Sequence, residues 1–470
     1  MSYDYDLVVI GSGPAGQKGA IAAAKLGKRV AVIERGHNVG GVCINTGTIP
    51  SKTLREAVLQ LSGYRERQMQ GDTYKPKRVP MSDLVARCQH VIRNEIEVVR
   101  NQLFRNDVEL IEAEASFIDS HTIALNGTEA ARKITSAFVL LAVGTTPTQA
   151  PHVAGVHDSD SILRLERIPK TMCVVGGGVI GCEYASMFAA LGVRVTVVEK
   201  RERLLPFVDA EIVEALSYHL RNQRLTMRLN EEVKSVELSE DGSDPDSSDK
   251  YSGEPHVLTR TVSGKTITTE VALFSAGRVG ATQALGLDKA GLSADARGRI
   301  AVNDKYQTAM PHIYAAGDII GFPSLASVAM EQGRVCAMHA FGLEATTIPA
   351  LFPYGIYTVP EISVLGKNEE ELTAVSRPYE IGKARYKEIA RGQIIGDETG
   401  MLKIIFDPST LEILGIHIIG EGASELIHIG QAVLALKGTL DYFVRTVFNY
   451  PTLAECYKVA ALDGLNRLRG

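Results

Sequence analysis

The stretch DLVVIGSGPAGQKGAIAAAKLGKRVAVIER, residues 6–35, has the pattern of one strand–helix–strand unit. Its first residues are apolar and β-branched, which is typical of a parallel strand buried on both faces. A Gly/Pro-rich turn and an Ala-rich segment follow and predict a helix, and residues 29–35 predict a second strand. This order predicts a βαβ unit and therefore an α/β fold with a parallel sheet.

Three glycines in the turn, Gly11, Gly13 and Gly16, have the spacing of a dinucleotide-binding loop. The first allows the tight turn, the second lets the backbone approach a pyrophosphate, and the third lets helix and strand pack closely. The free N–H groups at the start of the helix attract phosphate. Glu34 lies at the end of the next strand, eighteen positions after Gly16, where a carboxylate can bind both hydroxyls of an adenosine ribose.

The same pattern returns at residues 171–200, TMCVVGGGVIGCEYASMFAALGVRVTVVEK. Gly176, Gly178 and Gly181 repeat the spacing, and Glu199 again lies eighteen positions after the last glycine. Because each copy has its strand, its helix and its acid at the same distance, the match is more specific than a lone glycine pattern. Two copies predict two nucleotide-binding domains, one for a flavin dinucleotide and one for a nicotinamide dinucleotide.

The first site is the better flavin candidate because of a second glycine cluster, YAAGDIIG, residues 314–321. A strand that ends in Gly-Asp would place Asp318 against a ribityl hydroxyl or against water near the pyrophosphate. Taken alone, an Asp after a strand also fits an ordinary turn residue.

The composition is that of an ordinary globular protein. The 470 residues are 45% hydrophobic and 22% charged, and this length predicts about three domains. A net charge of −5 gives no general attraction to nucleic acid or anionic membranes, and no apolar run is long enough to span a bilayer. The start of the chain lacks a signal-peptide pattern, and six irregularly spaced cysteines do not suggest a disulfide framework. We expect a cytoplasmic protein with no nucleic-acid partner, no membrane partner and no metal site.

Other segments add elements to the prediction. Residues 82–106 have apolar positions three and four apart, which predicts a long amphipathic helix, and residues 137–147 predict a strand ending in a Gly/Thr turn. The acidic segment 237–257, rich in Ser, Gly and Pro, predicts a solvated loop that is disordered in part. From residue 348 the pattern predicts a mixed sheet and two helices, with strands at 361–366, 401–407 and 413–420 and helices at 423–436 and 452–468.

Six motifs occur in order between residues 6 and 320: GSGPAG, GGVCINTGTIPSK, AVGTTP, VVGGGVIGCE, AGRVG and AAGD. They resemble the motifs of the flavoprotein pyridine nucleotide–disulfide oxidoreductase family, and the C-terminal third resembles that family's dimerisation domain. The resemblance implies two Rossmann-like domains, for FAD and for NAD(P), plus a C-terminal α+β dimerisation domain. It implies an FAD domain at 1–150, an NAD(P) domain at 151–276, the return of the FAD domain at 277–347, and an interface domain at 348–470.

The chain departs from the family pattern where a redox disulfide would stand. Disulfide reductases of the family have two cysteines five positions apart, but here Cys43 is followed by Thr48. A hydroxyl forms no disulfide and is a poor nucleophile compared with a thiolate. In FNYPTLAEC, residues 448–456, Tyr450 stands where the family has a histidine, while Glu455 is retained. A tyrosine pKa of about 10 is not poised near neutral pH as a histidine pKa is, so the two departures together predict that no disulfide substrate is handled.

The resemblance also implies which residues lie at the flavin. Lys52 stands where the family's lysine lies near the flavin N5, and Glu183 matches its usual ion-pair partner. A lysine there stabilises negative charge on the reduced ring, although an isolated Lys and Glu would also fit a solvated surface. Lys52 and Glu183 are therefore the predicted catalytic pair. The residues predicted to bind FAD are Gly11, Gly13, Gly16, Glu34, Cys43, Thr48, Lys52, Gly144 and Asp318.

The second site combines an acid with a basic cluster. Glu199 favours the free 2′-hydroxyl of NAD, whereas Lys200, Arg201 and Arg203 directly after it offer groups for a 2′-phosphate. This mixture fits a pocket for both coenzymes, and it fits a solvated charge run equally well. Gly277 and Arg278 resemble the segment that returns to the FAD domain and touches flavin or nicotinamide. The residues predicted to bind NAD(P) are Gly176, Gly178, Gly181, Glu199, Lys200, Arg201, Gly277 and Arg278.

A flavin that accepts hydride but has no disulfide to reduce must pass the hydride elsewhere, and a second nicotinamide is the most economical acceptor. NTGTIPSK and FNYPTLAE resemble the soluble pyridine nucleotide transhydrogenase branch of the family. This resemblance implies Si-specific hydride transfer from NADPH to NAD⁺ through bound FAD, with NAD and NADP as substrates, in a homodimer or larger homo-oligomer. The alternatives are an NAD(P)H oxidase or quinone-reducing diaphorase, a dihydrolipoamide dehydrogenase-like enzyme, and a flavin redox sensor without catalysis.

Overall fold

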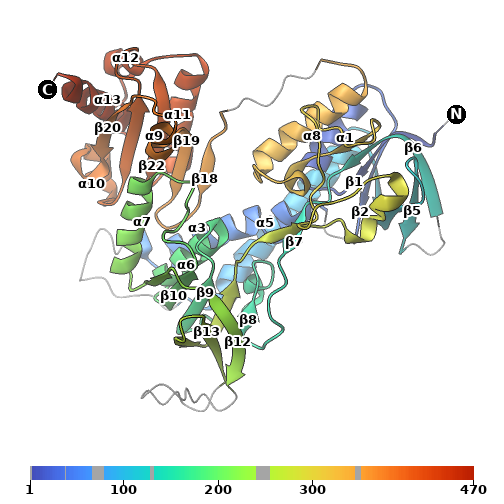
Figure 1. The fold of residues 1–470 in the computed structure, drawn as a ribbon, viewed down its shortest axis with the longest axis horizontal. Coiled ribbons are helices and arrows are strands. Elements are labelled where there is room, and N and C mark those ends of the chain that lie inside the picture. The colour runs from blue at the N-terminus through green and yellow to red at the C-terminus, as the bar shows by residue number, and fades with distance from the viewer. Residues whose placement is uncertain are drawn as a thin grey trace. The chain divides into compact units, whose positions relative to one another are not determined.

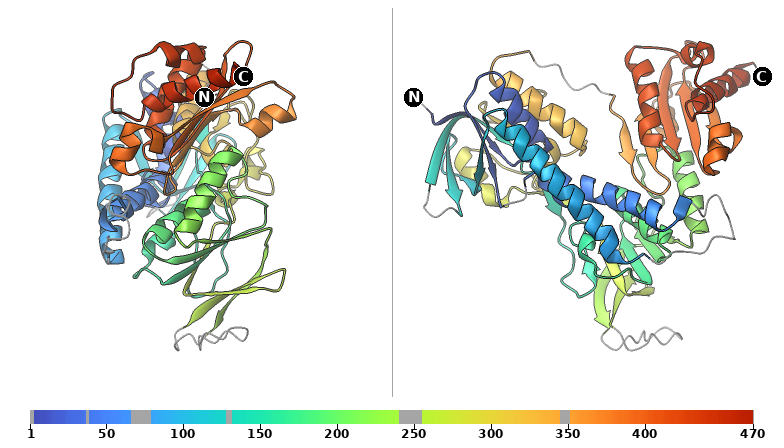
Figure 2. Two further views of the ribbon diagram at one scale, coloured as in Figure 1. Left: turned by 90° about the vertical axis from the view of Figure 1, so that its left-hand side faces the viewer. Right: turned by 180° about the vertical axis from the view of Figure 1, so that it is seen from behind.

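The structure is a computed structural model that describes residues 3–36, 39–65, 79–127, 132–239, 255–344 and 351–469. The chain divides into two compact units (Figures 1 and 2). Unit 1 comprises Met1–Thr53, Val85–Gln149 and Gly277–Pro349, and unit 2 comprises Leu54–Leu84, Ala150–Ala276 and Ala350–Gly470. The predicted NAD(P) and interface segments both fall in unit 2, and the boundary between them stays a prediction.

Unit 1 contains the first βαβ unit. The strands β1 (Tyr5–Ile10) and β2 (Val30–Glu34) are parallel neighbours joined by α1 (Pro14–Ala24). Along β1, Leu7 and Val9 join one hydrophobic cluster, while the alternate side chains join another. Both faces of the strand are therefore buried, which is the physical reason for its continuous apolar run.

The sheet of unit 1 has the strand order β3-β2-β1-β6-β5-β4, and β17 also pairs with β6. The helix α8 packs along α1, and the two lie side by side in both ribbon figures. The long predicted helix is confirmed as α5. The strand predicted within residues 137–147 is confirmed as the end of β6, which is followed by the turn at Gly144, but Thr145–Pro147 form a separate short strand, β7. Further elements of unit 1 are α2 (Gly41–Asn45), β3 (Glu109–Glu112), β4 (Glu114–Phe117), β5 (Thr122–Asn126), β6 (Arg132–Leu141), β7 (Thr145–Pro147), β16 (Arg278–Gly280), β17 (Ile313–Ala315) and α8 (Ala326–Ala340), while α3 (Thr48–Leu61) and α5 (Met81–Phe104) include residues of both units.

Unit 2 contains the second βαβ unit, in which α6 (Val179–Ala190) joins β9 (Thr171–Val175) to the parallel β10 (Arg194–Glu199). These strands belong to a parallel sheet of order β11-β10-β9-β15-β8, beside which β12, β13 and β14 form an antiparallel sheet. The further elements of this part are β8 (Val156–His157), α7 (Ala210–Asn222), β11 (Thr226–Leu229), β12 (Val233–Ser239), β13 (His256–Thr261), β14 (Thr266–Thr269) and β15 (Val271–Phe274).

The predicted acidic loop is shorter than expected at both ends. Residues 237–239 complete β12 and residues 256–257 begin β13, and these two strands pair with each other. Cross-strand pairing of their backbone groups therefore outweighs the loop-like composition at the edges of the segment. The central residues, 240–254, lie outside the described part of the chain.

The C-terminal part of unit 2 holds a sheet of order β18-β19-β22-β21-β20. Its described neighbours are all antiparallel, so the prediction of a mixed sheet is wrong. Short connections such as the one between β21 and β22 return the chain directly and enforce antiparallel pairing. The elements are β18 (Tyr354–Ile356), β19 (Ile362–Gly366), α9 (Glu369–Ala374), β20 (Glu380–Arg385), α10 (Ala390–Ile395), β21 (Met401–Phe406), β22 (Ile413–Ile419), α11 (Ala423–Ala435), α12 (Leu440–Arg445) and α13 (Glu455–Leu468), and α11 and α13 confirm the two predicted helices.

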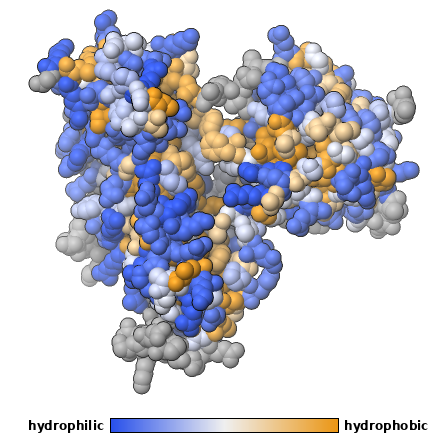
Figure 3. All heavy atoms as spheres, in the orientation of Figure 1, coloured by the Kyte–Doolittle hydropathy of each residue, from blue (hydrophilic) through white to orange (hydrophobic). Residues whose placement is uncertain are grey.

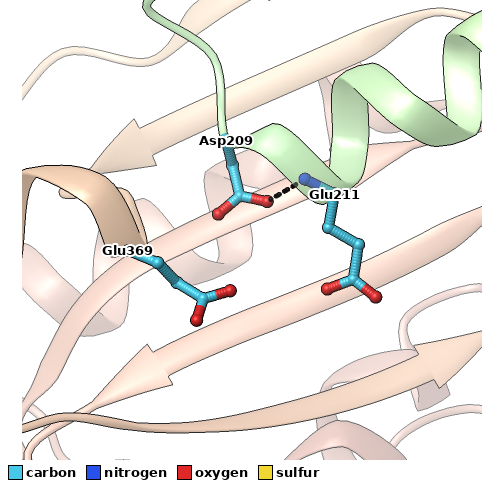
Figure 4. A group of neighbouring side chains, drawn as sticks. All are labelled: Asp209, Glu211 and Glu369. Carbon is cyan, nitrogen blue, oxygen red and sulfur yellow. Dashed lines mark hydrogen bonds between the residues drawn. The ribbon is translucent and has the colours of Figure 1, made fainter.

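A buried lysine connects α7 to this sheet. Asp209, Glu211 and Glu369 point toward one another (Figure 4). The Lys403 Nζ atom on β21 lies 3.0 Å from both carboxylate oxygens of Asp209 and 3.2 Å from Glu211, and it also pairs with Glu369. A cluster of acids can meet in a buried place only with compensating positive charge, and Lys403 supplies that charge.

Hydrophilic side chains cover much of the molecular face drawn in Figure 3, and hydrophobic side chains form smaller groups among them. None of the helices in the described ranges has both the length and the apolar composition needed to cross a membrane.

Candidate functional site

The first glycine turn has the geometry that its sequence predicts. Gly11 adopts a φ of 102°, and a Cβ there would lie 2.4 Å from the Ala142 carbonyl oxygen. A Cβ at Gly16 would lie 1.9 Å from the Gly11 carbonyl oxygen, so only glycine allows this close approach of helix and strand. Gly13 differs, because no heavy atom of the described residues, apart from Gly13 and its two chain neighbours, lies within 4 Å of its Cβ position. Its open side is where a phosphate can approach the start of α1.

The acid of the first site is held by a residue that the sequence prediction missed. The Ser12 hydroxyl donates to Glu34 Oε2 at 2.5 Å, and the Ser12 N–H donates to the same oxygen at 2.9 Å. The same hydroxyl accepts from the Gly40 N–H at 2.8 Å. Ser12 thus fixes one carboxylate oxygen of the buried Glu34. A hydroxyl directly after the first glycine is the only sequence signal for this role.

Several predicted flavin residues come together in unit 1. The Cys43 thiol on α2 is partly buried, and burial raises its pKa, while a hydrogen bond with Thr48 and the charge of Lys52 act in the opposite direction. The carboxylate of Asp318 lies near enough to raise the same pKa further. The structure therefore gathers Cys43, Thr48, Lys52 and Asp318 in one region, although they span more than half of the chain.

Arg278 belongs to unit 1, as Asp318 does. The second glycine turn and Glu199 belong to unit 2. The Arg278 Nε atom donates to the Thr145 hydroxyl at 2.9 Å, and its Nη2 atom donates to the Thr145 carbonyl oxygen at 2.8 Å. Burial raises the pKa of Asp318, and the Arg278 guanidinium and the Thr145 hydroxyl oppose this effect. Thr145, which directly follows Gly144, was not predicted as a site residue.

The second glycine turn repeats the first in detail. Gly176 has a φ of 106°, and a Cβ at Gly181 would lie 1.9 Å from the Gly176 carbonyl oxygen. Around Gly178, as around Gly13, the described chain leaves the Cβ position open to beyond 4 Å. The end of β10 places Glu199 beside this turn, where its Oε2 atom accepts from the Gly177 N–H at 2.6 Å. Unit 2 therefore offers a second dinucleotide site.

The basic cluster after Glu199 does not act as one group. Arg201 forms a two-pronged ion pair with the Glu199 carboxylate, with Nε···Oε1 and Nη2···Oε2 distances of 2.8 and 2.9 Å. Arg203 instead donates to Glu370 at 2.6 Å and to the Pro206 carbonyl oxygen at 2.7 Å. The side chain of Lys200 is exposed.

Two further residues singled out in the sequence, Glu183 and Tyr450, lie in unit 2, whereas Gly277 lies in unit 1. Glu183 is buried in α6, and its Oε1 atom accepts from the Tyr357 N–H at 2.8 Å. Lys52 lies in unit 1, so the ion pair between Lys52 and Glu183 stays a prediction. Tyr450 is 74% exposed, and Glu455 begins α13 and accepts from the Thr452 N–H at 3.4 Å.

Two family models match this sequence. Residues 5–333 match "Pyridine nucleotide-disulphide oxidoreductase", and residues 352–461 match the dimerisation domain of the same name. These matches span most of the chain and confirm the expected fold class and the resemblance.

Relatives and solved structures agree with the family models. Soluble pyridine nucleotide transhydrogenase of Mycobacterium tuberculosis (strain ATCC 25177 / H37Ra) is 52% identical over 99% of this chain and 98% of its own. The protein of that name from Pectobacterium atrosepticum is 46% identical over the same shares. The HOCl-induced flavoprotein disulfide reductase RclA from Escherichia coli, as its Cu(II) complex, is similar in structure with a TM-score of 0.87 and 25% identity over 98% and 99% of the two chains. LpdA from Mycobacterium tuberculosis has a TM-score of 0.86 and 26% identity over 97% and 99%. The chain belongs to the pyridine nucleotide-disulphide oxidoreductase family.

Proposed function

We propose that this protein is an FAD-dependent transhydrogenase that transfers hydride from NADPH to NAD⁺, giving NADP⁺ and NADH. The observation that carries the proposal is the combination of two intact dinucleotide turns with a missing disulfide partner, because Thr48 stands five positions after Cys43. The relatives named soluble pyridine nucleotide transhydrogenase support the same activity.

The residues of unit 1 fit FAD. The turn at Gly11, Gly13 and Gly16 leaves one open side for a pyrophosphate, and Ser12 occupies only one oxygen of Glu34. The other oxygen of that carboxylate can accept from a ribose hydroxyl. FAD supplies the hydride-accepting and hydride-donating chemistry that no side chain has.

The chain's own residues would bind and orient the cofactor and the two nicotinamide coenzymes. Lys52 brings a positive charge to the region of Cys43 and Asp318, where it would stabilise negative charge that develops during hydride transfer. The second turn and Glu199 would hold each nicotinamide coenzyme by its pyrophosphate and adenosine ribose. NADPH and NAD⁺ would use this site in succession, so the hydride never needs a thiol carrier.

We extend the proposal to Si-specific transfer, to a homodimer or larger homo-oligomer, and to a cytoplasmic location. The match to a dimerisation domain over residues 352–461 supports self-association, as do apolar side chains left open to water in this part of the chain, including Val447 at 90% exposure. All six cysteines are free thiols, which fits a reducing compartment. NADPH deuterated on one face of the nicotinamide ring tests the stereochemistry.

The activity is tested by mixing the FAD-loaded protein anaerobically with NADPH and thio-NAD⁺ and following thio-NADH. We expect turnover with thio-NAD⁺ and none with lipoamide or glutathione disulfide. Reduction of the bound flavin without formation of thio-NADH would contradict the proposal and would point to oxygen or quinones as acceptors.

A further inference from the structure

The carboxylate expected to bind the adenosine ribose in the second site already has partners within the protein. Glu199 is 3% exposed, and both of its carboxylate oxygens are engaged. Oε2 accepts from the Gly177 N–H at 2.6 Å and from Arg201 Nη2 at 2.9 Å. Oε1 accepts from the Arg201 N–H at 2.9 Å and from Arg201 Nε at 2.8 Å. The carboxylate that a ribose diol would need is therefore paired with an arginine.

The first site provides an internal comparison, because Glu34 occupies the matching position there. Its described hydrogen bonds come from Ser12 and reach only Oε2. The residue two positions after Glu34 is Gly36, where the second site has Arg201. A glycine cannot neutralise the acid, so the first site keeps a carboxylate that repels a 2′-phosphate. At this position the second site has a charged group that the first site lacks.

Two features make Arg201 able to change partners. Its side chain is 44% exposed, so the guanidinium can move into solvent without opening a packed core. Glu199 keeps its hydrogen bond from the Gly177 backbone when the arginine leaves, so the carboxylate stays in place. Arg203, by contrast, is held by Glu370 and by the Pro206 carbonyl oxygen.

We propose that Arg201 determines how one site accepts both NAD and NADP, by exchanging its partner when coenzyme binds. This inference rests on the proposed function. With NAD, the ribose hydroxyls take the place of Arg201 on Glu199. With NADP, the guanidinium turns from Glu199 to the 2′-phosphate, whose geometry it matches with two parallel hydrogen bonds. The phosphate carries nearly two negative charges near neutral pH, and Arg201 offsets its repulsion from Glu199.

The exchange predicts opposite effects on the two coenzymes. Replacing Arg201 by Ala or Gln should weaken binding of a 2′-phosphate ligand roughly 10- to 100-fold, because a charge-assisted, two-pronged contact is lost. Binding of the ligand without the phosphate should stay the same or become tighter, because its competitor for Glu199 is gone. Arg201→Lys should lie between these limits, since it keeps the charge and loses the fork.

The experiment measures the dissociation constants of adenosine 2′,5′-bisphosphate and of 5′-AMP for the FAD-loaded protein by isothermal titration calorimetry. The two probes differ only in the 2′-phosphate, and neither can be oxidised or reduced. Arg203→Ala is the matched control and should leave the ratio of the two constants unchanged. Thermal unfolding of each variant checks that the fold is retained.

Three results would overturn the inference. If Arg201→Ala weakens the binding of 5′-AMP as much as the binding of the bisphosphate, Arg201 only positions Glu199. If neither constant changes, Arg201 is a solvated surface charge. If the wild type binds neither probe, the turn does not recognise the adenosine half at all. Because no hydride moves in this assay, a failed transhydrogenase assay with the expected change in ratio would refute the activity and leave the role of Arg201 standing.

Discussion

At the scale of single residues, the exchange of one thiol for a hydroxyl changes what the region around Cys43 can do. Thr48 hydrogen-bonds the Cys43 thiol, and burial raises the pKa of that thiol above its ordinary value. The thiol is then protonated near neutral pH, and a protonated thiol is a poor nucleophile. The remaining described cysteines are free and buried. We therefore expect Cys43 to serve in packing and not as a nucleophile.

Replacing Cys43 by Ser should keep transhydrogenase turnover within roughly threefold of the wild type, because no thiolate takes part in hydride transfer. The measurement is the initial rate of thio-NADH formation, together with the flavin content of the purified variant. Lys52→Met is the contrasting variant and should slow the same reaction, because its charge near the reacting ring is lost. A loss of more than about tenfold in the Cys43 variant at full flavin content would show that the thiol participates.

At the scale of elements, the glycines of one turn serve separate purposes. A Cβ at Gly181 would lie 1.9 Å from the Gly176 carbonyl oxygen. The absence of a side chain at Gly181 therefore allows α6 to pack closely against the end of β9. At Gly178 the described chain leaves open space, and the φ of −80° is ordinary for any residue. We therefore expect the open space at Gly178 to serve a ligand and not the fold.

The pair Gly178→Ala and Gly181→Ala separates these purposes. Gly181→Ala should lower the free energy of unfolding by about 1–3 kcal/mol, because the new methyl group forces a backbone shift. Gly178→Ala should leave thermal unfolding unchanged and weaken NAD⁺ binding at least about tenfold, because the methyl group occupies the face that a pyrophosphate approaches. Thermal unfolding and NAD⁺ titration of both variants provide the measurement. Equal loss of stability in the two variants would contradict this division of roles.

At the scale of the whole molecule, one buried charge connects distant parts of the chain. Lys403 is fully buried and reaches Asp209, which lies 194 positions earlier in the sequence. Although burial raises the pKa of Glu211, the ammonium groups of Lys383 and Lys403 hold it below its ordinary value. Such a group stabilises the fold above its ordinary pKa of 4.5, and this contribution is lost as the pH falls through the lower folded-state value.

Replacing Lys403 by Met should lower the free energy of unfolding near neutral pH by about 3–5 kcal/mol, because buried carboxylates lose their counter-charge. Lys383→Met is the control: Lys383 contacts Glu211 at 2.6 Å but is partly exposed. Its loss should cost only about 0–1 kcal/mol. At about pH 3.5 the gap between wild type and the Lys403 variant should narrow, because protonated carboxyls no longer need the lysine. Urea unfolding at both pH values measures the difference in unfolding free energy between the wild type and the Lys403 variant. A difference that widens in acid would refute this account.

The sequence by itself determined the two strand–turn–helix units, the long helix α5 and the helices α11 and α13. These features depend on local spacing: apolar runs, glycines at fixed intervals, and an acid eighteen positions on. The sequence also showed that the second cysteine of the family's redox disulfide is missing, because the two positions of that motif are identified from their spacing alone. It missed Ser12, because the position between the first two glycines carries no fixed identity in the motif. It also missed α7, whose N-cap residue Asp209 pairs with Lys403 far along the chain.

Only the tertiary structure decided which charges meet. Arg201 and Arg203 are two positions apart in one basic run, yet one binds Glu199 and the other binds Glu370. Arg278 joins Thr145 across 133 positions of sequence, and the strands of the C-terminal sheet are antiparallel where a mixed sheet was expected. Local patterns fix helices and strands because those depend on neighbouring residues. Long-range partners depend on how the chain returns to itself, and no spacing of a few residues encodes that path.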